Sequence, residues 1–218
     1  MTSNKEDYLK IIYDAGGFDT YVSNKVISEK LGIAPASVSE MLAKLQHEGL
    51  IEYRAYHGSK LSQKGLASCI DVVRGHKLWE VFLVRHLGYT LWEAHEEAHL
   101  LEHIASERML QRLDNFLEHP KTCPHGSLIP QIDDPVPQYS FPLKKLCEME
   151  INESARIAQV LEDKKLLDYL ERSQVKIGTV IHLVGKDDYE GPVSFEQDGK
   201  IISVSYKAAT QIFVQTIK

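Results

Sequence analysis

The sequence predicts a mainly α-helical protein that ends in a small β-barrel. Three patterns indicate this fold class: two short helices and a hairpin near the N-terminus, longer amphipathic helices in the middle, and five short strands after a proline-rich segment. We expect a winged helix-turn-helix over residues 1–64, a helical domain over 65–129, a linker over 130–142 and a barrel over 143–218.

The bulk composition is that of a globular protein. The chain has 218 residues, of which 43% are hydrophobic and 26% charged, enough for two or three domains. No apolar run approaches the roughly 18 residues that span a membrane, and residues 1–8 are unlike a secretory signal. Three cysteines at unrelated spacings imply no disulfide framework. We therefore expect a cytoplasmic protein without a membrane partner.

Helix signals near the N-terminus indicate a helix-turn-helix. A first helix is expected over residues 4–14, and a second begins after Ser23 and stops at Gly32. A third helix enters through Pro35 and ends at Gly49. Two short helices joined by a tight glycine-containing turn are typical of this motif.

A short hairpin after the third helix turns the motif into a winged helix. Residues 50–54 look like a strand, and residues 56–59 like the hairpin tip. The early third helix presents small and polar groups that can approach base edges in a major groove, namely Ala36, Ser37, Ser39 and Glu40.

Basic side chains of the same segment are candidates for phosphate contacts: Lys25, Lys30, Lys44, Arg54 and Lys60. The net charge of −6 argues mildly against nucleic acid, but residues 1–64 carry eight basic and eight acidic residues and are neutral. The alternative is a protein-binding winged helix whose charges are merely solvated.

The middle of the chain carries groups suited to binding metal. His95, His99 and His103 follow one another at i, i+4, and Glu102 lies three residues after His99, in an uninterrupted helical pattern. Imidazoles and a carboxylate on one stripe suit a first-row divalent cation, whereas a surface cluster without metal is the alternative.

The flanking segments add further groups. An amphipathic helix from residue 62 to 87 carries His76 and Glu80, again at i, i+4, and Thr90 is expected to cap the following helix. Cys123 and His125 form a loop pair that is a weak metal signal by itself. Apolar residues between 62 and 117 indicate a candidate dimer interface.

The C-terminal part has a different pattern. Its Asp198-Gly199 pair reads as a hairpin turn, and a short helix is expected over residues 163–170. The expected strands cover residues 156–160, 176–184, 192–195, 201–204 and 211–216.

In order and spacing, the whole chain resembles the metal-dependent repressors of the diphtheria toxin repressor type. It is most similar to the manganese- or iron-responsive Gram-positive branch that keeps a C-terminal SH3-like domain of the FeoA type. The matching stretches are Glu6 to Leu9, Arg74 to Glu80 and His95 to His103.

The resemblance implies two metal sites per subunit. One would join Asp7 to His99, Glu102 and His103. The second would draw on His76, Glu80, Cys123 and His125, with His95 a further candidate and Asp163 or Glu162 completing it.

The resemblance also implies a function: a metal-activated repressor that binds palindromic DNA operators as a homodimer and controls metal-ion uptake genes. His99 departs from the family pattern, which has a carboxylate in manganese members and a cysteine in iron members at this position. Asp7 stands where iron members have a thioether, and its hard oxygen favours Mn²⁺, with Fe²⁺ close behind.

Two other functions compete with this one. His95-Glu96-Glu97-Ala98-His99 is an H-E-x-x-H pattern, so a zinc metallopeptidase would use Glu96 as general base and Glu118 as third ligand. That function leaves the winged helix and the remaining candidate ligands unexplained, so we do not expect an enzyme. A metal-independent winged-helix regulator would bind its operator equally well in chelator.

Overall fold

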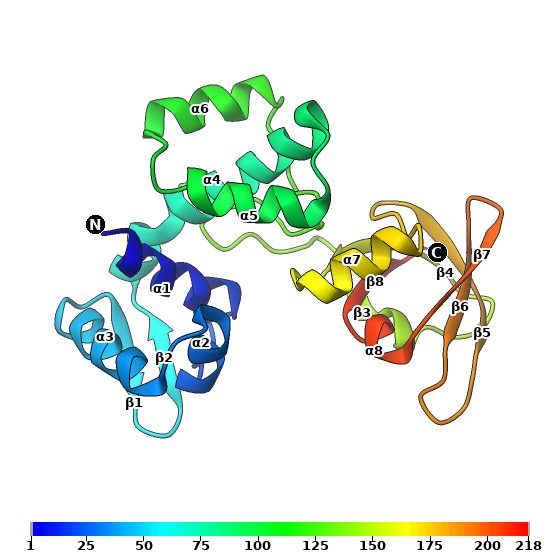
Figure 1. The fold of residues 1–218 in the computed structure, drawn as a ribbon, viewed down its shortest axis with the longest axis horizontal. Helices are drawn as coiled ribbons and strands as arrows, with labels where there is room; N and C mark the ends of the chain where they lie inside the picture. The colour runs from blue at the N-terminus through cyan, green and yellow to red at the C-terminus, as the bar shows by residue number, and fades with distance from the viewer. Residues whose placement is uncertain (1, 218) are drawn as a thin grey trace. The chain divides into compact units, whose positions relative to one another are not determined.

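The computed structural model describes residues 2–217, drawn in Figure 1. They form two compact units. The first contains the residues up to 76 with residues 100–111 and 130–137, and the second contains residues 77–99, 112–129 and those from 138 onward. Within the described residues, no helix is both long and apolar enough to cross a membrane.

The first unit contains the expected winged helix-turn-helix. Ser23 caps the second helix by accepting the Val26 N–H at 3.4 Å, and Gly32 ends that helix at a left-handed φ of 65°. The two strands pair antiparallel, with Ile51 opposite Leu61. The elements are α1 (Ser3–Asp14), α2 (Asn24–Leu31), α3 (Pro35–His47), β1 (Ile51–Arg54) and β2 (Gly58–Leu61).

One buried apolar cluster holds this winged helix together. Leu9 and Ile12 of α1 are fully buried in the same cluster as Val38 and Leu42 of α3. Close-packed cores transmit displacement because few voids absorb it. The position of the first helix is therefore tied to that of the third.

Part of the expected linker packs onto the first unit. The Tyr13 hydroxyl donates to the Pro135 carbonyl at 2.8 Å, and Val136 packs against the apolar cluster. Proline content indicates an extended chain, but it does not reveal these contacts.

Three helices follow the wing: α4 (Gln63–Leu87), α5 (Leu91–Leu101) and α6 (Glu107–Phe116). Thr90 caps α5 as expected, since its N–H donates to the Glu93 carboxylate at 2.9 Å and its Oγ1 accepts the Glu93 N–H at 3.3 Å. The helix ends earlier than predicted. Glu102 and His103 lie in a turn after Leu101, closed by a bond from the Ile104 N–H to the Leu101 carbonyl.

The second unit contains a six-stranded antiparallel sheet in the order β3-β8-β4-β5-β6-β7. Among the described residues this order does not close β7 onto β3, so the predicted small barrel is an open small sheet by its hydrogen bonds. The elements are β3 (Lys144–Lys145), the 3-10 turn η1 (Leu146–Glu148), β4 (Ser154–Val160), α7 (Lys164–Arg172), β5 (Val180–Lys186), β6 (Val193–Gln197), β7 (Lys200–Val204), α8 (Tyr206–Ala209) and β8 (Ile212–Thr216).

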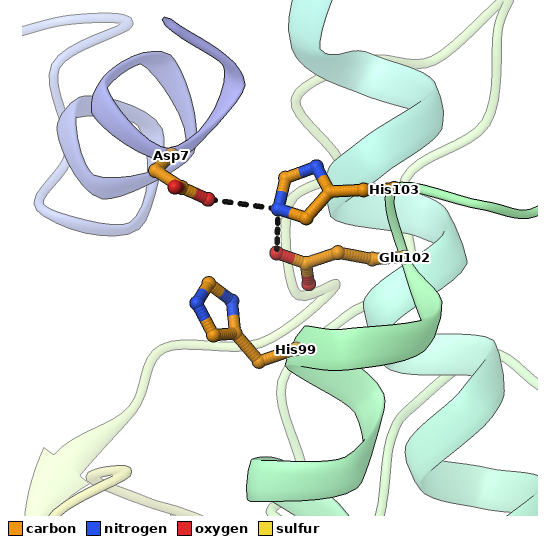
Figure 2. A group of neighbouring side chains, drawn as sticks. All are labelled: Asp7, His99, Glu102 and His103. Atoms are coloured by element: carbon orange, nitrogen blue, oxygen red, sulfur yellow. Dashed lines mark hydrogen bonds and ion pairs between the residues drawn. The ribbon is translucent and has the colours of Figure 1, made fainter. Parts of the chain in front are cut away.

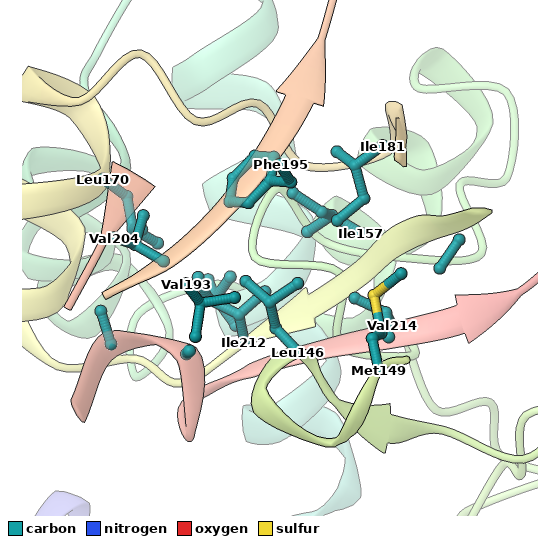
Figure 3. Close-up of a cluster of buried hydrophobic side chains, with 14 of the residues drawn as sticks. Leu146, Met149, Ile157, Leu170, Ile181, Val193, Phe195, Val204, Ile212 and Val214 are labelled. Atoms are coloured by element: carbon teal, nitrogen blue, oxygen red, sulfur yellow. The ribbon is translucent and has the colours of Figure 1, made fainter. Parts of the chain in front are cut away.

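The core of this sheet domain is a single apolar cluster, shown in Figure 3. Phe195 of β6, Ile157 of β4 and Leu170 of α7 are among its buried side chains. Asp198 and Gly199 both have positive φ, 51° and 75°, and join β6 to β7 as the predicted hairpin turn.

Candidate metal centres and DNA interface

The first candidate centre lies where α1 meets the turn after α5. His103 Nε2 is 2.8 Å from Asp7 Oδ1 and 3.5 Å from Glu102 Oε1. Figure 2 draws both contacts as dashed lines. On its other side, His103 Nδ1 is 2.8 Å from Glu6 Oε2. Potential ligand atoms of Asp7, Glu102 and His103 all lie within 4.8 Å of one another. Carboxylates and an imidazole at this spacing can share one divalent cation.

Local structure explains why these groups face one another. Tyr8, Leu9 and Ile12 turn the apolar side of α1 into the core, which leaves Asp7 on the flank of the helix. His99 is exposed on α5, one turn before His103, and is drawn with the other three in Figure 2.

Glu102 has a second, deeper set of contacts. Its buried carboxylate places Oε2 2.5 Å from His76 Nδ1 and 2.7 Å from Lys10 Nζ. The predicted second-site residue His76 thus lies against the first cluster, although it also stands one turn before Glu80 on α4. Lys10 and Glu6 were missed in the sequence. Their only signal is that they lie within one turn of Asp7 on α1.

The second candidate centre lies within the second unit and is built around Glu80. Its Oε1 is 3.1 Å from His95 Nδ1, and its Oε2 is 3.2 Å from His125 Nδ1. Cys123 Sγ lies 3.7 Å from His125 Nδ1. Glu162 approaches the same group, 4.0 Å from His125 and 3.9 Å from His95. Glu80, Cys123, His125 and Glu162 each offer a ligand atom within 4.8 Å of the others.

The loop that carries Cys123 and His125 is fixed to the sheet domain. The His125 carbonyl accepts the Val160 N–H of β4 at 3.0 Å, and the Tyr139 hydroxyl donates to the Gly126 carbonyl. Gly126 has a φ of 89°, and a Cβ there would lie 1.9 Å from the Ala158 carbonyl oxygen. Only glycine lets the loop approach β4 this closely.

The two barrel carboxylates offered by the sequence have different surroundings. Asp163 caps α7, since its side chain accepts the Leu166 N–H at 3.0 Å. Glu162, one residue earlier, is the carboxylate that faces His125 and His95. Its Oε1 is also 4.0 Å from the buried Lys77 ammonium.

Burial and neighbouring charges shift the pKa values of two side chains in the second cluster, Cys123 and His125. Burial raises the pKa of the Cys123 thiol, and the Glu80 carboxylate raises it further. Burial alone would lower the pKa of His125, but Glu80 and Cys123 outweigh it and raise that pKa well above its ordinary value. Among the described residues, His125 Nε2 is fully buried and has no hydrogen-bond partner.

The candidate DNA-binding groups lie on the surface of the first unit. Ala36, Ser37, Ser39 and Glu40 are all exposed on α3, and of the basic residues Lys25, Lys30, Lys44 and Arg54 are exposed whereas Lys60 is half-buried. Lys44 pairs with Glu40 at 2.7 Å, and the Arg54 guanidinium lies 4.7 Å from the centre of the Tyr21 ring.

Comparison with known proteins agrees with this architecture. Residues 1–59 match the family described as iron dependent repressor, N-terminal DNA binding domain. Residues 62–131 match the iron dependent repressor, metal binding and dimerisation domain, and residues 144–216 match the FeoA domain.

Individual relatives show the same pattern. The iron-dependent repressor IdeR of Mycobacterium tuberculosis is 33% identical over 130 residues, which are 60% of this chain and 56% of IdeR, so the match spans just over half of that relative. The structure of the manganese regulator SloR is 40% identical, covers 100% of both chains and has a TM-score of 0.79. A manganese-dependent transcriptional repressor in complex with manganese is 30% identical, covers 97% of this chain and 99% of its own, and has a TM-score of 0.86.

A winged helix combined with clustered carboxylate, imidazole and thiol groups defines a metal-responsive DNA-binding regulator. The chain belongs to the family of iron- and manganese-dependent transcriptional repressors of the diphtheria toxin repressor type. The resemblance inferred from the sequence is confirmed. Members of this family are transcriptional regulators rather than enzymes, so the metallopeptidase alternative has no support. Within its H-E-x-x-H stretch, His95 contacts Glu80 and Glu96 is exposed.

Proposed function

We propose that this protein is a Mn²⁺-activated repressor, with Fe²⁺ as the second candidate metal, that acts in the cytoplasm as a homodimer on palindromic operators of metal-uptake genes. The observation that carries the proposal is the convergence of Asp7, on the first helix of the DNA-binding fold, with Glu102 and His103.

The first centre fits a hard divalent ion. Asp7 and Glu102 offer carboxylate oxygens and His103 offers Nε2, while His99 stands one turn away as a fourth ligand. Carboxylate-rich donor sets suit Mn²⁺ more than softer metals. A bound divalent ion would be coordinated by all of these side chains and would neutralise part of their negative charge.

The core of the winged helix explains how metal binding at this centre can affect DNA binding. Asp7 is rigidly attached to α1, whose Leu9 and Ile12 share a buried cluster with Val38 and Leu42 of α3. Fixing Asp7 against Glu102 and His103 therefore limits where the recognition helix can sit. A dimer with fixed recognition helices selects one spacing of operator half-sites.

The second centre fits a metal on independent grounds. His125 turns its Nδ1 toward the other donors, 3.2 Å from Glu80 Oε2, 3.7 Å from Cys123 Sγ and 4.0 Å from Glu162 Oε1. Cys123, Glu80 and Glu162 complete a donor set that is softer than the first, and His95 adjoins it. We assign these residues to the second site, with Glu162 in place of Asp163.

Dimerisation is supported by exposed apolar side chains in the region that matches the dimerisation family. Met109 and Phe116 lie two turns apart on α6 and are 48% and 59% exposed. Such residues on a helix are suited to burial against a second copy.

The test is binding of the metal-free protein to a palindromic promoter fragment, followed by fluorescence anisotropy as Mn²⁺, Fe²⁺ or Zn²⁺ is added. We expect Mn²⁺ to raise the affinity of the wild type by about tenfold or more. Asp7→Asn should lose this response, while Asp14→Asn, an exposed acid on the same helix, should keep it. Equal DNA binding in metal and in chelator would contradict the proposal.

A further inference from the structure

We propose that Lys10 is a resident cation of the first centre: its ammonium neutralises the inner face of Glu102 in the metal-free protein and weakens the affinity of the centre for divalent ions. This inference rests on the proposed function, because it concerns the same cluster. It assigns a role to a buried lysine that the ligand set does not use.

The geometry places the ammonium among metal-binding atoms. Lys10 Nζ lies 2.7 Å from Glu102 Oε2 and 2.9 Å from His76 Nδ1. A carboxylate oxygen and an imidazole nitrogen are also the atoms that a transition-metal ion would contact. The ammonium thus fills the inner side of Glu102, while Oε1 faces His103 on the outer side.

Burial makes this charge necessary in the absence of metal. The Glu102 side chain has no exposed surface, and that of Lys10 is only 10% exposed. A buried carboxylate without a positive partner is strongly destabilising. Lys10 therefore compensates the Glu102 carboxylate and holds it in place before any ion arrives.

The same charge opposes the incoming ion. The Glu102 carboxylate and the His76 imidazole contact the Lys10 ammonium, and the carboxylates of Glu6, Asp7 and Glu102 contact His103 in the same cluster. An ammonium and a divalent ion that share one carboxylate repel each other, most strongly where little water screens them. Lys10 accordingly raises the metal concentration at which the centre fills.

The decisive variants are Lys10→Met, which removes the charge and keeps an unbranched apolar stem, and Lys10→Gln, which keeps a polar end. Lys5→Met is the matched control, because Lys5 lies on the same helix and its 2.5 Å ion pair with Glu48 is at the surface. Lys10→Arg keeps the charge.

Mn²⁺ binding to the full-length protein is measured from the free-ion electron paramagnetic resonance signal. The Asp7→Asn variant identifies which binding event belongs to the first centre.

We expect Lys10→Met and Lys10→Gln to bind Mn²⁺ at the first centre about tenfold more tightly than the wild type. Lys5→Met and Lys10→Arg should match the wild type. In thermal unfolding, Lys10→Met should melt lower without metal and gain more from Mn²⁺ than the wild type does.

Unchanged or weaker Mn²⁺ affinity in both neutral variants would overturn the inference and leave Lys10 as a residue that only orients Glu102. If wild type and Asp7→Asn bind Mn²⁺ alike, the first centre itself is refuted. The two failures are therefore distinguishable.

Discussion

Gly126 lies where the loop of Cys123 and His125 approaches β4 closely. Gly126→Ala would place a Cβ 1.9 Å from the Ala158 carbonyl at a φ of 89°. We expect a loss of about 3 kcal/mol in the free energy of unfolding, from strain and from displaced contacts. Chemical denaturation measures it. Metal binding at the second centre should weaken as well, because His125 is the neighbouring residue.

Gly178→Ala is the matched control for this substitution. Gly178 also has positive φ, 86°, but a Cβ there would meet nothing within 4 Å. Only backbone strain remains, so we expect a loss of about 1 kcal/mol and unchanged metal binding. Equal losses in the two variants would show that the approach to β4 is unimportant.

Glu153 gives the sheet domain a pH-dependent contribution to stability. The Lys144 ammonium, 2.6 Å from both carboxylate oxygens, holds the pKa of Glu153 below its ordinary value of 4.5, and the Glu150 N–H adds to the effect. A lowered folded-state pKa stabilises the fold above pH 4.5, and this stability is lost as pH falls through the lowered pKa.

Glu153→Gln should therefore lower the free energy of unfolding by about 1 kcal/mol at pH 7. The difference from the wild type should shrink as the pH falls below 4.5. Urea unfolding at a series of pH values measures both. A difference that stays constant across the series would show that the Glu153 charge has no part in it.

Spacing along the sequence indicated the group of His99, Glu102 and His103, whereas only the family resemblance added Asp7 to it. His99, Glu102 and His103 are close in sequence, so their helical spacing is enough to predict that they lie together. Lys10 and Glu6 meet His76 and His103 only through the tertiary fold, since 66 and 97 residues separate these pairs. Asp163 and Glu162 are adjacent, and only the capping bond of α7 distinguishes their roles.

The wing formed by β1 and β2 offers a test of the DNA interface. Arg54 is exposed on β1 and stacks on Tyr21. We expect Arg54→Ala to weaken binding to all DNA sequences about equally and to reduce the salt-dependence slope by about 1, as loss of one phosphate contact requires. Anisotropy titrations at several salt concentrations measure it.

Lys200→Ala, at an exposed position of β7, should leave both affinity and slope unchanged. A loss confined to the cognate operator in Arg54→Ala would instead assign Arg54 to base reading.

Elements with strong local signals were predicted well. The N-cap Ser23, the stop at Gly32 and the cap at Thr90 depend on neighbours within a few residues. The short β3 was missed because its two residues carry no periodicity and exist as a strand only through pairing with β8. Closure of the sheet into a barrel likewise depends on pairing between strands that are far apart in the sequence, which local patterns do not reveal.

The exposed apolar side chains of α6 offer a test of the proposed dimer. Phe116→Asp should place a charge in the proposed apolar interface and weaken dimerisation by about 10-fold or more. Sedimentation velocity in the presence of Mn²⁺ should then show monomer at concentrations where the wild type is dimeric. Ile201→Asp, which changes an apolar side chain that is 71% exposed on β7, is the control and should not alter the dimer.

We propose that occupancy of the first centre and DNA binding are thermodynamically coupled. Coupled sites must influence each other by the same factor. The most direct measurement is Mn²⁺ affinity with and without saturating operator DNA, in the wild type. The operator should tighten Mn²⁺ binding by the same factor by which Mn²⁺ tightens operator binding, about 5- to 150-fold. An Mn²⁺ affinity that is unaffected by operator DNA would contradict the account.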